Sequence, residues 1–244
     1  GRKNMLDRFN AIKFVMLVSF VSSLVLALLY STLINRVEEN IRLDKKQSIL
    51  RVIGINSSNL SSEEVNLKYK EHINEFVINT DGEIVDIPLS EIVWKENKST
   101  GMTDYLYSKN MLQYLPLYKS KNPNGYIIPI SGKGLWSTLK GYFAISEDKN
   151  TSLGIVFYSH KETPGLGGEV DKVWFQDQFK IDKGKKIFNK NGTLVSIIVN
   201  NRKNTDGKTH EVDGITGATV TSNGVTKFLK RDLERYKNFL IGQE

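Results

Sequence analysis

Residues 213–222 read Asp-Gly-Ile-Thr-Gly-Ala-Thr-Val-Thr-Ser and stand directly before a segment with helical periodicity. The apolar residues of that segment recur at three- and four-residue spacing, which predicts one buried helical face formed by Val225, Phe228, Leu229, Leu233, Tyr236 and Leu240. Thr219, Thr221 and Ser222 place hydroxyls at the helix start, where free amides and the helix dipole favour a phosphate group. Because Ser and Thr are also common as simple helix caps, the residue types leave a phosphate site and a cap both open.

A second informative segment lies near the N-terminus. From Phe14 to Ile34 the chain carries no charged residue, and about 20 apolar residues suffice to cross a bilayer as a helix. The alternative is a cleaved signal peptide, whose apolar region is shorter and ends in a small-x-small site. Tyr30, Leu33 and Ile34 do not form such a site. We therefore expect a retained single-pass membrane anchor.

Charges flanking this segment indicate its orientation. Basic residues dominate before it, offset only by Asp7, whereas bases and acids are mixed after it. The positive-inside rule then predicts a cytoplasmic N-terminus and a main domain outside the cytoplasm. In a bacterium this means the inner membrane, with the domain in the periplasm or cell exterior. The absence of cysteine agrees with that location, because no disulfide is required and no thiol can ligate zinc or an iron–sulfur cluster.

The remaining chain predicts one α+β domain, mainly antiparallel. Residues 1–35 are the expected cytoplasmic N-terminus and anchor, 36–60 a connecting helix and linker, and 61–244 the outer domain. Ser61 and Glu64 can form a capping box for a short helix. A hairpin is expected where residues 76–78 and 84–85 flank Thr-Asp-Gly. Further strands are expected at residues 126–130, 141–145, 153–158 and 194–199, and Pro129 places the first of these at an edge or at an early end.

Two glycine-containing loops add candidate binding residues. Residues 160–168 read His-Lys-Glu-Thr-Pro-Gly-Leu-Gly-Gly, a loop that can wrap a planar ligand or simply connect a strand to a helix. Residues 132–137 read Gly-Lys-Gly-Leu-Trp-Ser, in which Trp136 can stack on a ring or lie in the core. The serine at the third glycine position excludes a dinucleotide fingerprint.

Other classes of site find little support. The three histidines, His72, His160 and His210, are too dispersed for a metal centre, and no nucleophile motif is present. The net charge of +7 comes from basic residues interspersed with acids, so a solvated surface is favoured over a nucleic-acid partner.

Residues 213–222 resemble the flavinylation motif of the FMN-binding domain family, in which a flavin transferase moves FMN from FAD onto a threonine through a phosphoester. The resemblance implies Thr219 as the acceptor of covalent FMN. It also implies that Thr216, Gly217, Ala218 and Thr221 lie at the cofactor. Asp213, together with Gly217 and Ala218, would be recognised by the transferase.

The two glycine-containing loops are similar to signatures of one branch of the same family, His-x-Glu-Thr-Pro-Gly-Leu-Gly and Gly-x-Gly-Leu-Trp. This similarity implies that Glu162, Thr163, Leu166 and Gly167 lie near the flavin. It also makes Trp136 a candidate wall of the ring site.

The whole layout, including residues 43–50 (Leu-Asp-Lys-Lys-Gln-Ser-Ile-Leu), looks like the branch of the family that belongs to Na+-pumping NADH:quinone oxidoreductases. The homologous flavin-bearing component of an ion-pumping ferredoxin:NAD oxidoreductase complex is the alternative. Either resemblance implies an electron-carrying subunit without independent turnover, which receives electrons from an iron–sulfur centre in neighbouring membrane subunits and passes them to another flavin. NADH, quinone and sodium are not expected to bind this chain directly. A membrane-anchored extracellular binding domain without a redox role is the alternative from another class.

Overall fold

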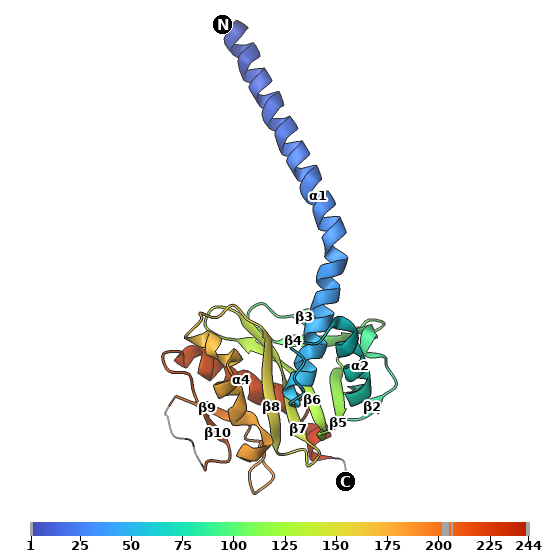
Figure 1. Cartoon of the computed structure of the whole chain (residues 1–244), viewed down its shortest axis with the longest axis vertical. Coiled ribbons are helices and arrows are strands. Elements are labelled where there is room, and N and C mark those ends of the chain that lie inside the picture. The colour runs from blue at the N-terminus through green and yellow to red at the C-terminus, as the bar shows by residue number, and fades with distance from the viewer. Residues whose placement is uncertain (1, 202–204, 206, 243–244) are drawn as a thin grey trace. The chain divides into compact units, whose positions relative to one another are not determined.

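A computed structural model describes residues 2–201, 205 and 207–242, with side chains from residue 9 onward. The chain begins with one helix, α1 (Arg2–Val52) (Figure 1). Its part from Phe9 to Val52 is, among the described helices, the one long and apolar enough to cross a membrane, and the apolar window within it is not buried. The expected anchor and the expected connecting helix are therefore one continuous helix. The basic side chains of residues 2–8 lie outside the described side chains.

The contacts within the chain divide it into residues 1–44 and a compact unit that begins at Lys45. The last turns of α1 belong to this unit, because Ser48, Ile49, Leu50 and Val52 are buried. The domain boundary expected at residue 61 thus lies inside the compact unit, since the apolar side of residues 45–52 is used for packing rather than as a linker.

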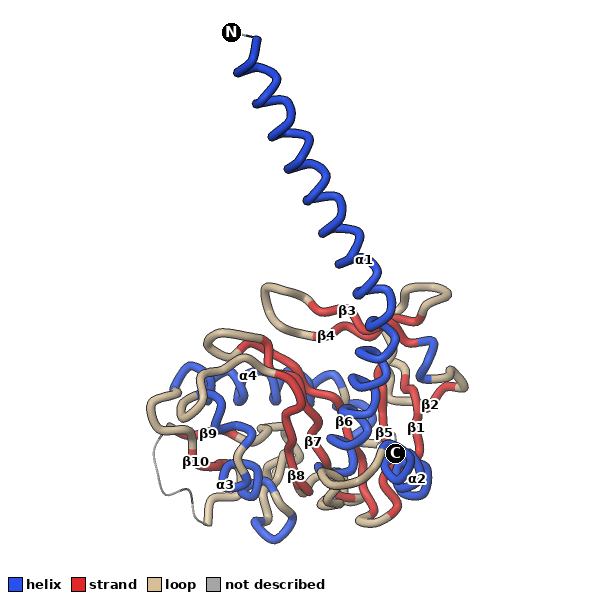
Figure 2. The backbone as a smooth tube through the Cα atoms, turned by 45° about the horizontal axis from the view of Figure 1, so that its top comes forward, coloured by secondary structure: helices blue, strands red, loops and turns tan. Residues whose placement is uncertain are grey.

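The centre of the compact unit is a six-stranded antiparallel sheet, which confirms the mainly antiparallel α+β prediction. Its strands, in spatial order, are β2 (Ile84–Val85), β1 (Ile73–Ile78), β5 (Leu115–Lys121), β6 (Asn124–Lys133), β7 (Thr138–Ser146) and β8 (Ser152–Ser159). Two smaller sheets accompany it: an antiparallel hairpin of β3 (Ile92–Glu96) and β4 (Thr103–Tyr107), and a parallel pair of β9 (Ile198–Asn200) and β10 (Glu211–Asp213). Figure 2 shows these strands in red.

Helices cover the sheet on both faces. They are α2 (Ser62–His72), α3 (Val173–Gln176), α4 (Thr219–Arg235) and α5 (Lys237–Ile241). Ser61 and Glu64 form the predicted capping box at α2. In β6 and β7 the main core includes Ile128 and Phe143, whereas their neighbours Ile127 and Tyr142 are buried outside that cluster. Because successive strand residues point to opposite faces, these two sets of residues lie on opposite faces of the sheet. The main core with α4 lies on one face, and α2 with the last turns of α1 covers the other (Figures 1 and 2).

The predicted apolar face of the C-terminal helical segment is confirmed. All six of its residues are buried, and four of them, Val225, Phe228, Leu229 and Leu233, belong to α4. The helix crosses β6, where Gly132 leaves room for Phe228, because a Cβ at Gly132 would collide with that ring. Burial of the apolar stripe holds α4, and with it Thr219 at its first residue, against the sheet.

Two expectations about strands are wrong. Pro129 lies inside β6, which lies between β5 and β7 and continues to Lys133, so the strand is neither at an edge nor ended early by the proline. The β5–β6 pairing ends at Tyr118 and Ile127, before the proline, so on that side no strand requires the missing N–H. The strand expected at residues 194–199 is restricted to Ile198–Asn200, because Ser196 has a left-handed φ of 68° that interrupts extended backbone.

Candidate functional site

The motif at residues 213–222 joins the end of β10 to the start of α4. Asp213, the last residue of β10, receives a hydrogen bond from the Thr205 amide at 2.9 Å, and its own amide donates to Oε1 of Gln178 at 2.7 Å. The next amide, that of Gly214, donates to the Asn200 carbonyl at 2.6 Å. Both sides of the strand end are thereby fixed. Asp213 is engaged within the fold, and its recognition by a transferase stays a prediction.

A tight turn then leads into the helix. The Ala218 amide donates to the Ile215 carbonyl at 3.0 Å, and both side chains are buried. Gly217 has φ of 77°, which favours glycine. A Cβ on Gly217 would also lie only 3.0 Å from Cδ2 of Leu166. The predicted residues Gly217 and Leu166 are therefore in contact range, beside the first residue of α4.

The hydroxyls of the motif have different environments. Thr221 is buried and its hydroxyl donates to Oε2 of Glu162 at 2.8 Å, while the Ser222 hydroxyl accepts from the Ile215 amide at 3.1 Å. Thr216 and Thr219 are exposed. The N-cap residue of α4 is Ala218, and no side chain caps the helix. The simple-cap interpretation is therefore wrong, and the first amides of α4, which have no intrahelical acceptor, are left uncapped by side chains.

Glu162 is the buried carboxylate of this region, only 5% exposed. Its Oε1 accepts from the amides of Trp136 and Ser137, each at 3.0 Å, and from the Ser137 hydroxyl at 3.2 Å. Its Oε2 accepts from the Leu135 amide at 3.1 Å and from Thr221. Burial on its own would raise the pKa of Glu162, but the hydrogen bonds from Thr221 and the three amides together lower it. The carboxylate is ionised and connects the 135–137 loop to α4.

Two glycines make room for this carboxylate. A Cβ at Gly134 would lie 2.7 Å from Oε1 of Glu162, and a Cβ at Gly167 would lie 2.6 Å from both Oε2 and the Thr221 hydroxyl. The space that these glycines leave is therefore filled by Glu162. The predicted contact of Gly167 and Glu162 with a cofactor stays a prediction.

The remaining predicted residues, Trp136, Leu166 and Thr163, are exposed on the surface. Trp136 is 72% exposed and Leu166 is 43% exposed, so Trp136 is not a core residue. Thr163 is also exposed, and its carbonyl accepts from the amides of Leu166 and Gly168, which closes the loop. Thr221 connects through Glu162 to the Trp136 amide. The loop carrying Leu166 and the loop carrying Trp136 thus both border the start of α4.

A pocket of about 490 Å³ opens beside the motif, within the size range of ligand sites. It is lined by Gly165, Glu169, Trp174, Asp213, Gly214, Ile215 and Thr216. Trp174 donates from Nε1 to Oε2 of Glu169 at 3.0 Å. The sequence analysis missed Trp174 and Glu169, because their segment carries no spacing that distinguishes them from a surface turn. Trp136 does not line this pocket.

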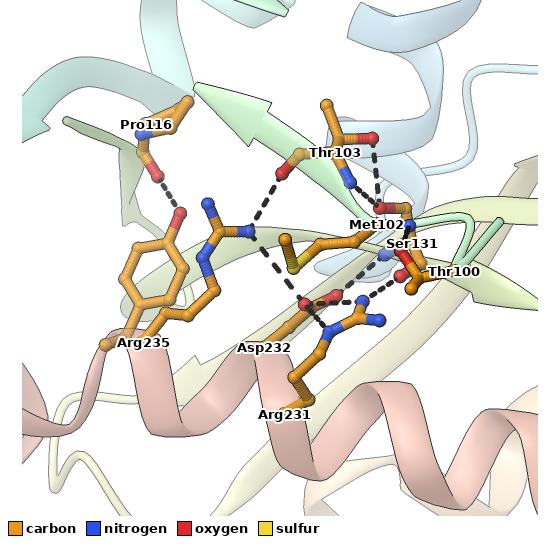
Figure 3. A network of polar contacts seen from close by, with 9 residues as sticks. Thr100, Met102, Thr103, Pro116, Ser131, Arg231, Asp232 and Arg235 are labelled. Carbon is orange, nitrogen blue, oxygen red and sulfur yellow. Dashed lines mark hydrogen bonds and ion pairs between the residues drawn. The ribbon is translucent and has the colours of Figure 1, made fainter. Parts of the chain in front are cut away.

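Charged side chains fix α4 to β6 and β4 farther along the helix (Figure 3). Asp232 is buried and accepts from the Ser131 amide at 2.8 Å, and Nε of Arg231 donates to it at 3.0 Å. Arg231 also donates to the Ser131 carbonyl, and Arg235 donates to the Thr103 carbonyl at 2.9 Å. Burial raises the pKa of Asp232, opposed by the two arginines and the Ser131 amide. Ser131 lies in β6, the strand that leads into the Trp136 loop, so this network holds that strand to α4, while Glu162 connects the loop itself to α4.

Comparison with known proteins relates this geometry to a family. Residues 134–234 match the model of the FMN-binding domain. The C subunit of the Na+-translocating NADH-quinone reductase from Pseudomonas aeruginosa is 36% identical over 206 residues, with 78% of each protein covered. The corresponding C subunit from Vibrio anguillarum is 33% identical over 241 residues, with 88% of each covered. The chain belongs to the family of these C subunits. The crystal structure of the Parabacteroides distasonis member has a TM-score of 0.67 at 33% identity, covering 85% of this chain and 96% of that one.

Membership of this family confirms the resemblance that the sequence favoured, and does so over most of the chain. The part that matches the FMN-binding domain contains the Trp136 loop, Glu162 and the whole segment from Asp213 to nearly the end of α4. Within this part, Glu162 connects the Trp136 loop to Thr221 near the start of α4. The chain is thus a subunit of an oxidoreductase complex, and among its described helices α1 is the one suited to anchor it in a membrane.

Proposed function

We propose that this chain is the flavin-carrying electron-transfer subunit of a Na+-translocating NADH:quinone oxidoreductase, with FMN esterified to Thr219. The observation that carries the proposal is the position of this hydroxyl. Thr219 is exposed at the first residue of α4, whereas the hydroxyls of Thr221 and Ser222 are engaged inside the protein. The uncapped amides and the dipole of a 17-residue helix favour a phosphate at this position.

Attachment would be a phosphoryl transfer from FAD, catalysed by a flavin transferase. Oγ of Thr219 forms the new bond to the phosphorus of the FMN half, and the bond from that phosphorus to the bridging oxygen breaks. AMP leaves, and the hydroxyl proton passes to a base of the transferase or to water. The exposure of Thr219 supports this step because the hydroxyl must enter the active site of another enzyme.

The residues around Thr219 fit the parts of FMN. Gly217 and Ala218 bring the backbone close to the phosphate, and Thr216 offers an exposed hydroxyl beside it. Trp136 and Leu166 present apolar surface that a flavin ring can cover, since both are exposed. We place Thr163 and Gly167 in the loop beneath the ring. Glu162 and Thr221 contribute by fixing the two loops to α4 rather than by donating to the ring.

When bound, the flavin supplies the redox chemistry, and the chain supplies position and electrostatics. The phosphoester would retain the cofactor in a periplasmic domain without tight equilibrium binding. We propose that α1 crosses the inner membrane with its N-terminus in the cytoplasm. The subunits that carry iron–sulfur and flavin centres would be the partners that deliver and accept electrons.

Covalent flavin in the full-length protein tests the proposal. The chain is co-expressed with its flavin transferase, denatured, and examined for flavin fluorescence in the gel. Thr219→Val should abolish the signal, whereas Thr216→Val, the matched exposed threonine, should retain it. A fluorescent Thr219→Val protein would reject the acceptor assignment, and a wild-type protein without covalent flavin would favour a non-redox binding domain.

A further inference from the structure

His160 lies directly after β8 and begins the loop that contains Glu162. Its side chain is only 13% exposed. The Glu162 amide donates to Nδ1 of His160 at 3.1 Å, and Nε2 of His160 lies 2.6 Å from Oδ2 of Asp171. Asp171 is the last residue of the 3₁₀ turn Gly167–Asp171. The imidazole therefore bridges the beginning of the loop and the turn that ends it.

These two contacts determine the protonation of the ring. An amide N–H can donate to Nδ1 only when that nitrogen carries no proton. Nε2 must then carry the proton, and it donates to the carboxylate of Asp171, the partner that selects this tautomer. A protonated Nδ1 would place two N–H groups against each other and separate Glu162 from His160.

The orientation of Glu162 depends on this contact. Its side chain receives hydrogen bonds from both the 135–137 loop and Thr221, while its backbone is held by the imidazole two residues earlier. We propose that His160, as the neutral Nε2–H tautomer, is a positioning residue that acts through Glu162 to set the spacing of Leu166, Trp136 and Thr219. The inference rests on the proposed function, because these three residues border the proposed flavin site.

The tautomer is measured directly in the flavin-loaded, full-length protein labelled with ¹⁵N-histidine. The chain has three histidines, so the His160 signals are assigned by comparison with the His160→Asn variant. We expect Nδ1 of His160 to resonate as an unprotonated nitrogen and Nε2 as a protonated one. The reverse pattern, or two protonated nitrogens at neutral pH, would overturn the inference independently of the flavin.

Substitutions separate the two contacts. In His160→Asn, the side-chain carbonyl can replace Nδ1 as the acceptor. In His160→Gln, the longer side chain can replace only the Nε2 donor, with its NH₂ group. In His160→Ala we expect a several-fold rise in flavin fluorescence, because Trp136 no longer quenches the ring, and a shifted flavin potential. His160→Asn should restore both properties better than His160→Gln. His72→Asn, at the partly buried last residue of α2, is the matched control and should equal the wild type in both properties.

The outcomes distinguish this inference from the function on which it rests. Wild-type protein without covalent flavin would reject the proposed function and the positioning role together. Covalently loaded His160→Ala with wild-type fluorescence and potential would reject only the positioning role. A His160→Gln variant that restores both properties as well as His160→Asn would reject action through the Glu162 amide.

Discussion

Glu162→Gln should destabilise the compact unit strongly, although it changes one atom type. The carboxylate accepts five hydrogen bonds, three at Oε1 and two at Oε2. A glutamine best retains its carbonyl at the Oε1 position, so its NH₂ faces the Leu135 amide and the Thr221 hydroxyl. The hydroxyl can rotate to accept, but the Leu135 amide cannot and loses its acceptor.

The magnitude follows from this count. An unsatisfied buried donor costs about 1–3 kcal/mol, and bonds to a charged group are worth about 1.5–3 kcal/mol against about 1 kcal/mol for neutral ones. We expect the free energy of unfolding to fall by about 3 kcal/mol. At about 2–4 °C per kcal/mol for a domain of this size, the melting temperature should fall by about 6–12 °C. Urea denaturation of the detergent-solubilised full chain, followed by tryptophan fluorescence, measures the change.

The pH dependence gives an independent check. The pKa of Glu162 is lowered in the folded state. Its ionised form therefore contributes its full stability above the pKa of the unfolded state, about 4.3, and this contribution is lost as the pH falls through the lower pKa of the folded state. Wild type should therefore lose more stability on acidification than Glu162→Gln. Glu169→Gln, which removes a charge at the partly exposed Trp174 contact, is the control and should change stability by about 0.5 kcal/mol or less. A Glu162→Gln protein as stable as this control would refute the reasoning.

Three further outcomes are expected. Gly224→Ala should destabilise by about 1–3 kcal/mol despite the higher helix propensity of alanine, because its Cβ would collide with the Lys133 carbonyl; a more stable variant in urea melts would contradict the packing. Asp232→Asn should lower the free energy of unfolding by about 2 kcal/mol, because an asparagine side chain cannot accept from both the Ser131 backbone amide and the arginines as a carboxylate does. An unchanged thermal denaturation curve would contradict this prediction. Trp136→Ala should increase the fluorescence of attached flavin, whereas Trp174→Ala should not; the opposite result would place the ring in the 490 Å³ pocket.

The elements predicted correctly are those that depend on local sequence. The apolar stripe of α4 repeats over successive helical turns, and the capping box at α2 involves residues three apart. The hairpin of β1 and β2 surrounds Gly82, whose φ of 88° requires a turn residue. In each case the interactions that determine the element join residues close in sequence, so the local sequence pattern predicts them.

Missed elements depend on contacts between distant parts of the chain. No strand was expected at β3, β4 or β5, and β5 contains Pro116 and two lysines, which disfavour a strand by composition. It forms because it lies between β1 and β6 in the centre of the sheet. The expectation that Pro129 marks a strand edge or an early strand end is wrong for a similar reason. The pairing of β6 with β5 ends before the proline, so the N–H that proline lacks is not needed on that side.

The glycines of the candidate site also show that local sequence does not reveal contacts between distant residues. Gly167 belongs to a loop that the resemblance places near a flavin, and the space that a Cβ on Gly167 would occupy is filled by Glu162 and Thr221. Glu162 lies 27 residues from Leu135 and 59 residues from Thr221 in sequence, so no local pattern reveals that it joins them. The candidate site residues were predicted by resemblance, whereas the hydrogen bonds that connect them became visible only in the fold.

The hydrogen bonds of Glu162 explain why one hydroxyl of the motif suits covalent attachment. The motif offers four hydroxyls, those of Thr216, Thr219, Thr221 and Ser222. A helix turns about 100° per residue, so the side chains of Thr219 and Thr221 point to nearly opposite sides of α4. Glu162 takes the Thr221 hydroxyl on the inner side, which leaves Thr219 directed outward beside the uncapped amides. Thr216 is also exposed, but it lies before the helix and lines the neighbouring pocket. The hydrogen bond that stabilises the fold at Thr221 and the free hydroxyl at Thr219 therefore follow from the same helical register.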